Sequence, residues 1–191
     1  MTIQTMKYLE PDIALQNQFK RWSFRLAGAI VLLGLAVLMA WLLGLGQLYT
    51  NGRLFVQMNP LTALCFIALA TAYWLLNRHS RTTGPLLCTL VALVAFSKVI
   101  EWWGGPALAL DQLLFPGQLR LHTPPNQMAP NTAVGLLIVS AGLLLLNVNI
   151  RSRHRPAHYL AFLLFILSLA SLLGYLYQVE QFYGIMTYIP M

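Results

Sequence analysis

Charged residues are scarce in this sequence. Only 9% of its 191 residues are Asp, Glu, Lys or Arg, whereas 58% are hydrophobic and the mean hydropathy is +0.66. A soluble globular domain usually carries about 25% charged residues, so the composition excludes a soluble protein and predicts an all-α integral membrane protein. Because a membrane span needs roughly 20 apolar residues, the chain has room for about five or six spans and for no sizeable soluble domain.

Cysteine and histidine are also sparse, which limits the possible metal and cofactor chemistry. Cys65 and Cys88 both lie inside apolar runs, where we expect small buried hydrophobic residues rather than zinc ligands. The four histidines flank the apolar runs or lie in a loop, so no pair of imidazoles faces the membrane interior to hold a haem. Hydrolase, P-loop, zinc-protease and dinucleotide-binding motifs are lacking as well. The sequence therefore predicts neither an enzyme nor a metal site, and it names no cofactor.

A short stretch that occurs twice organises the rest of the chain. Residues 58–64 and 128–134 share Met, Pro, Thr and Ala at a fixed offset of 70 residues, and each copy opens a long apolar run. Proline suits the first position of a helix, because the N–H that it lacks would have no partner inside the helix there. Both copies therefore predict helix starts, at Pro60 and Pro130.

Five apolar runs are long enough to cross a membrane, and the basic residues between them predict the orientation. Lys and Arg are enriched in cytoplasmic loops. The N-terminal segment and the loops after the second and fourth runs hold nine basic residues, whereas the opposite loops hold only Arg53 and Arg120. The sequence therefore predicts a cytoplasmic segment, 1–25, and a transmembrane domain, 26–191, whose C-terminus is outside. The predicted spans are 26–45, 60–76, 84–103, 130–146 and 157–179.

The second and fourth spans both start on the outer face in this topology. Residues 58–127 and 128–189 are therefore predicted to form two helical hairpins in a parallel repeat, preceded by one leading helix. Residues 11–25 have two interpretations, an amphipathic helix on the cytoplasmic surface or a simple lead-in to the first span.

The repeated stretch belongs to a longer series of motifs. The two Met-x-Pro-x-Thr-Ala helix starts, residues 111–115, residues 174–177 and the terminal Pro190-Met191 follow one another along the chain. In this order the chain resembles the multi-span N-terminal membrane region that precedes PAS, histidine-kinase and diguanylate-cyclase modules in bacterial signalling proteins. The resemblance implies a sensor region of the inner membrane, with a further helix starting near Met191. The sequence departs from the family pattern at Leu61, because the first copy has Leu after its proline where the second copy has Asn131. The resemblance names no ligand.

Lys98 and Glu101 are the sharpest candidates for a functional site, because a charge at the centre of a membrane helix costs about 2.5–3.5 kcal/mol. They are three residues apart in one predicted helix, so their side chains can pair. One interpretation is an interfacial Glu101 and a snorkelling Lys98 within an aromatic belt. The other is an outer-leaflet pocket, where the starts of the second and fourth spans attract an anion. Its candidate ligand-binding residues are Lys98, Glu101, Trp102, Trp103, Asp111, Asn131, Thr132, Thr62 and Glu180, with Asn59 at the rim.

Two classes of function fit these features. The first is a sensory module without enzymatic activity, in which a small apolar or anionic ligand changes how the hairpins pack. The second is a membrane enzyme, a transport component or an accessory subunit that acts on or beside a quinone or a lipid, with Glu101 as proton acceptor. The expected partners are the lipid bilayer and a second copy or a larger membrane complex. Topology accounts for the net charge of +7, so no nucleic acid is expected.

Overall fold

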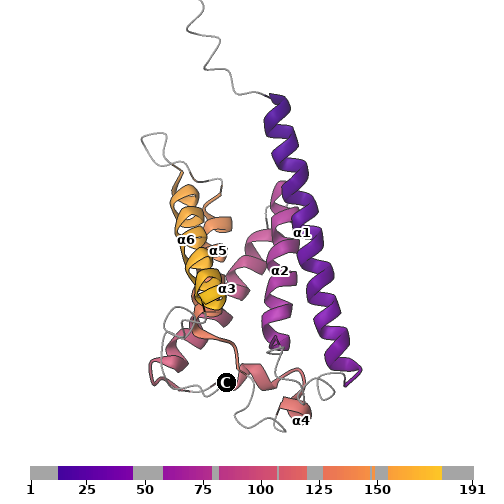
Figure 1. The fold of residues 1–191 in the computed structure, drawn as a ribbon, viewed down its shortest axis with the longest axis vertical. Helices are drawn as coiled ribbons and strands as arrows, with labels where there is room; N and C mark the ends of the chain where they lie inside the picture. The colour runs from indigo at the N-terminus through magenta and orange to yellow at the C-terminus, as the bar shows by residue number, and fades with distance from the viewer. Residues whose placement is uncertain are drawn as a thin grey trace, which may run out of the picture.

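The described part of the protein is all-helical. The computed structural model describes residues 13–44, 58–78, 82–106, 108–119, 127–146, 148 and 155–177, and no strand occurs among them. A 3₁₀ turn, η3 (Leu110–Gln112), and a short helix, α4 (Pro116–Leu119), lie in the connection between α3 and α5 (Figure 1). The five longer helices are α1 (Ile13–Leu42), α2 (Pro60–Asn77), α3 (Thr83–Trp102), α5 (Pro130–Leu144) and α6 (Pro156–Tyr177).

Four of these helices are long and apolar enough to cross a membrane: α1, α2, α3 and residues Pro156–Gly174 of α6. The prediction of an all-α membrane protein is confirmed to this extent. The remaining helix, α5, has 15 residues. At 1.5 Å per residue it is about 22 Å long, shorter than the roughly 30 Å hydrocarbon core.

Helices α2 and α5 begin at the two repeated prolines, Pro60 and Pro130. The start of α2 is also capped, because Asn59 Oδ1 accepts a hydrogen bond of 2.8 Å from the Leu61 N–H. Residue Ala129 has no side chain that can do the same for α5. The repeated proline is therefore common to both starts, whereas the side-chain cap belongs to α2.

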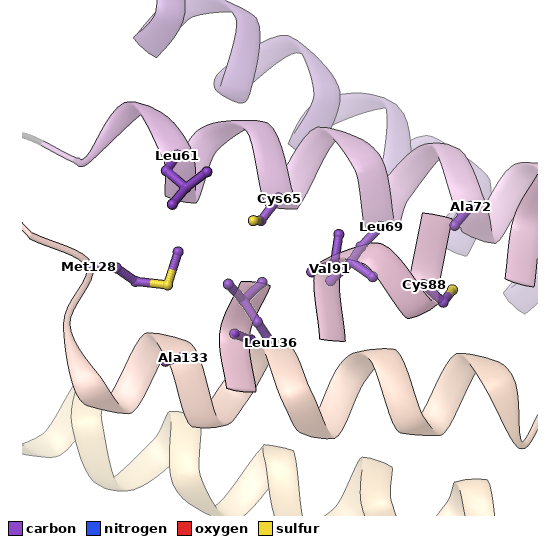
Figure 2. Close-up of a cluster of buried hydrophobic side chains, with 10 residues drawn as sticks. Leu61, Cys65, Leu69, Ala72, Cys88, Val91, Met128, Ala133 and Leu136 are labelled. Carbon is purple, nitrogen blue, oxygen red and sulfur yellow. The ribbon is translucent and has the colours of Figure 1, made fainter. Parts of the chain in front are cut away.

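The helices pack in the sequence α1, α2, α3, α5, α6, with α2 also touching α5. Figure 1 shows that α2 and α5 begin at the same end of the bundle, where η3 and α4 also lie. The buried core lies between α2, α3 and α5, and the two cysteines are part of it (Figure 2). Its members are Leu61, Cys65, Leu69, Ala72, Cys88, Val91, Ala95, Met128, Ala133 and Leu136.

Helix α1 is longer than the predicted first span. It is a single helix of 30 residues, about 45 Å long at 1.5 Å per residue. Residues 13–25 continue the helix without a break, so they form no separate surface helix and lead directly into the apolar part of α1. The N-terminal turns of α1 project beyond the neighbouring helices (Figure 1).

A glycine sets how closely α1 approaches α2. A Cβ atom added at Gly34 would lie 2.6 Å from Ile67 Cγ1 and 3.2 Å from the Ala63 carbonyl oxygen. Both distances are too short for ordinary carbon contacts. Small residues of this kind allow the backbones of membrane helices to pack closely, so the α1–α2 contact depends on Gly34.

We predict that Gly34→Ala lowers the thermal stability of the purified protein in detergent by about 1–3 kcal/mol, the usual cost of overpacking. The matched control is Gly28→Ala on the same helix, where the added Cβ would lie 3.6 Å from the nearest atom of Trp74, an ordinary contact. Alanine has the higher helix propensity, so the control is expected to be neutral or slightly stabilising. Equal melting temperatures for the two variants would show that the α1–α2 contact does not depend on Gly34.

Candidate functional site

A lysine is buried near the end of α3 between two carboxylates. Lys98 is 2% exposed, and its Nζ lies 2.7 Å from Glu101 Oε2, one turn further along the helix. The same ammonium also pairs with Asp111 Oδ2 on η3. The first contact follows from the i, i+3 spacing on one helix, whereas the second requires the chain to turn back after α3.

Asp111 connects this ion pair to a third element. Its side chain is 2% exposed, and its Oδ1 accepts a hydrogen bond of 3.3 Å from the N–H of Met128, which leads into α5. Lys98, Glu101, Asp111 and the Met128 backbone are called the charge cluster below. The charge cluster thus joins the end of α3, the turn η3 and the approach to α5.

The chain reaches this position through two left-handed backbone conformations. Gly104, just after α3, has φ +86°, and Ala109, just before η3, has φ 47°. Glycine tolerates this region freely, but an alanine there is strained by about 1–2 kcal/mol. Asp111, two residues further on, is held by Lys98 and by the Met128 N–H, so the loop is fixed at the charge cluster.

The charge cluster carries two negative charges and one positive charge. The excess negative charge lies beside the approach to α5 and on a turn that contacts α2. Helix starts carry partial positive charge, so they stabilise a nearby anion. The carboxylate of Asp111 binds the N–H of Met128, two residues before α5; that the starts of these two helices attract an anion stays a prediction.

Two tryptophans fix the repeated methionines in the same way. Trp102 Nε1, at the end of α3, donates to the carbonyl oxygen of Met128 over 3.4 Å. Trp41 Nε1, near the end of α1, donates to the carbonyl oxygen of Met58 over 3.0 Å. Each repeated Met-x-Pro stretch is therefore held by an indole from the end of the preceding long helix. Sequence reasoning missed Trp41, although a tryptophan near a helix end before each stretch was the available signal.

The other predicted site residues lie outside the charge cluster. Trp103 is 83% exposed and lies outside the charge cluster. Thr62 is buried in the first turn of α2, while Asn131 and Thr132 are half-buried in the first turn of α5. Among the described residues, the interactions that define the charge cluster include neither threonine. Glu180 lies outside the residues that the structure describes.

The donor set does not match a metal centre. No group of three or more His, Cys, Asp or Glu side chains converges within the described ranges. Between the two carboxylates, the position that a cation would occupy is taken by the ammonium of Lys98. The charge cluster is therefore a closed ion-pair network, with Glu101 as its most accessible member at 18% side-chain exposure.

No family model, curated protein or solved structure matches this chain. Its function therefore has to be inferred from its own residues.

We predict an order of destabilisation in the charge cluster, measured by thermal unfolding in detergent. Lys98→Met is the most costly change, about 3–5 kcal/mol, because it leaves the buried carboxylate of Asp111 without its cation. Asp111→Asn follows, and Glu101→Gln costs least, because Glu101 is partly exposed and Lys98 keeps its partner on η3.

The compensating double variant provides the control. Lys98→Met combined with Asp111→Asn removes both buried charges, so it should be milder than Lys98→Met alone. Effects that add within about 0.5 kcal/mol would show that Lys98 and Asp111 are not coupled. The second substitution is at Asp111, because its carboxylate is the more buried partner of Lys98. The i, i+3 spacing alone had suggested Glu101.

Proposed function

We propose that this chain is a membrane-embedded sensory or ligand-binding module of a bacterial signal-transduction protein, situated in the inner membrane. The observation that carries the proposal is the buried Lys98, shared between a helix end and a loop turn. Ionisable residues within membrane segments are costly and usually serve a function. Here the charge of Lys98 links the loop between α3 and α5 to the end of α3. A sensor requires such a link, because a ligand at the loop must change how the helices pack.

The proposed mechanism is an exchange of partners at Lys98. A ligand that displaces η3 removes Asp111 from the ammonium, and an anionic ligand competes with that carboxylate directly. Since an unpaired buried charge is costly, the end of α3 and the approach to α5 then have to rearrange. A ligand that favours the displaced arrangement shifts the population towards it.

The second candidate is a membrane enzyme, transport component or accessory subunit that acts on or beside a quinone or lipid. It is favoured by the partial exposure of Glu101, which leaves this carboxylate accessible to a proton. The sensory function is preferred because Lys98 and Asp111 are fully buried and bind each other. Neither residue is presented to a substrate in this arrangement.

We predict that loosening the charge cluster changes helix packing at the opposite end of the bundle. Spin labels at Leu26 on α1, two residues from the Phe24–Tyr73 contact, and at Leu86, in the first turn of α3, are both exposed and report on that end. In a background with Cys65→Ala and Cys88→Ala, Asp111→Asn should shift or broaden the distance distribution between the labels by about 1–2 Å, typical of helix shifts. Pulsed electron resonance in vesicles measures this distribution.

Leu113→Ala is the control, because this exposed loop residue is two positions from Asp111 and makes none of the interactions of the charge cluster. It should reproduce the parent distribution. If Asp111→Asn does so too, the charge cluster only anchors the loop and transmits nothing, and the sensory proposal is wrong.

The proposed topology has the N-terminus inside, five spans including α5, and the C-terminus outside. We predict that a membrane-impermeant maleimide labels Gln118→Cys on α4 but not Ser152→Cys in intact cells, in the same cysteine-free background. Labelling of Ser152→Cys alone would reverse the orientation. The positive-inside pattern is the reason for the expectation.

The parallel repeat of residues 58–127 and 128–189 is part of the proposal. It is supported by the common direction of α2 and α5 (Figure 1) and by the matching indole contacts at Met58 and Met128. Because the indoles come from α1 and α3, the similarity between the two repeat units includes the end of the helix that precedes each of them.

A further inference from the structure

One face of α1 is basic and lines a hollow at the end of the bundle remote from the charge cluster. Asn17, Lys20, Arg21, Phe24 and Arg25, all of α1, line an open hollow of about 500 Å³. Their spacings of three and four residues place them on one side of the helix. Phe24 also contacts Tyr73 of α2, with ring centroids 5.5 Å apart, so the edge of this face reaches α2.

The hollow lies at the depth of lipid headgroups if α2 crosses the membrane. Helix α2 has 18 residues, about 27 Å, which nearly matches a hydrocarbon core of roughly 30 Å. Because α1 and α2 are antiparallel, Lys20 is level with the end of α2 at Asn77, four residues beyond the Phe24–Tyr73 contact in each helix. Lys20 and Arg21 therefore lie at the boundary between the hydrocarbon and the headgroups.

The cations at this boundary have no anionic partner among the residues that the structure describes. Lys20, Arg21 and Arg25 are exposed, and no ion pair within the described residues involves them. Arg25 lies over the ring of Trp22, 5.4 Å from its centroid. The two described carboxylates, Glu101 and Asp111, belong to the charge cluster at the other end of the bundle.

The opposite side of the same turns is apolar. Leu15, Phe19, Trp22 and Leu26 are exposed there and follow one another at intervals of four, three and four residues. At about 100° per residue, this stripe is roughly opposite the basic face. The apolar side is thus available to lipid chains, while Lys20 and Arg21 line the hollow on the other side.

We propose that this hollow binds the headgroup of an anionic phospholipid. Guanidinium groups bind phosphate oxygens through paired hydrogen bonds, and Lys20 adds a further positive charge. Basic sites beside membrane helices recognise anionic headgroups in this way. A lipid is favoured over a soluble anion, because the site lies at headgroup depth and the same turns of α1 expose apolar side chains on their other side. The lipid would then anchor the projecting turns of α1 at the membrane surface, independently of any sensory role.

The test is a titration of phosphatidylglycerol into the detergent-solubilised chain, followed by native mass spectrometry, with phosphatidylcholine as the reference lipid. In one variant, Lys20→Gln and Arg21→Gln are combined with Phe19→Lys and Trp22→Lys, two exposed positions on the opposite side of the same turns. The net charge and the depth stay constant, but two cations leave the basic face. We expect this relocated variant to bind phosphatidylglycerol at least about 10-fold more weakly than the parent, and phosphatidylcholine binding to be equal in both.

The matched control removes three cations elsewhere on the same predicted side, with Arg151→Gln, Arg153→Gln and Arg155→Gln. It should bind phosphatidylglycerol like the parent. Equal binding by the relocated variant and the parent, or an equal loss in the control, would show that general surface charge attracts the lipid, and the proposal is then wrong. Displacement of the lipid by an equal concentration of inorganic phosphate would also overturn it, because the site would then select a free anion.

Discussion

The structure depends on the burial of one ammonium group. Lys98 is enclosed near the end of an apolar helix, where its charge is tolerated only with anionic partners close by. One partner comes from its own helix and the other from η3, which in turn binds the approach to α5. The lysine therefore fixes three segments relative to one another, and a change at any of them alters the surroundings of a buried charge.

Hydrogen bonds from indoles complete this end of the bundle. The carbonyl groups of Met58 and Met128 are each held by a tryptophan from the preceding long helix, Trp41 and Trp102. The ring of Trp41 also stacks on Phe115, with centroids 5.9 Å apart, so α1 contacts the same loop that carries Asp111. Both helix starts and the loop thus form one connected assembly, even though α1 and α3 lie on different sides of α2.

The two ends of the bundle use charge in contrasting ways. At one end the charges are buried and satisfied by each other, which makes them sensitive to small displacements. At the other end Lys20 and Arg21 are exposed and line an open hollow on α1, where water or a lipid headgroup can solvate them. A signal that crosses the membrane through these helices would link a closed ion-pair network to a contact with the lipid surface.

The sequence by itself determined the features that depend on composition and on neighbours along the chain. Scarce charge predicted apolar helices, proline predicted the starts of α2 and α5, and the i, i+3 spacing predicted that Lys98 and Glu101 can pair. Only the tertiary structure decided the Lys98–Asp111 pair, the indole contacts of Trp41 and the close approach at Gly34. These contacts join segments that are distant along the chain, and their formation depends on how the helices pack and where the loop turns back. Local spacing cannot fix either of these.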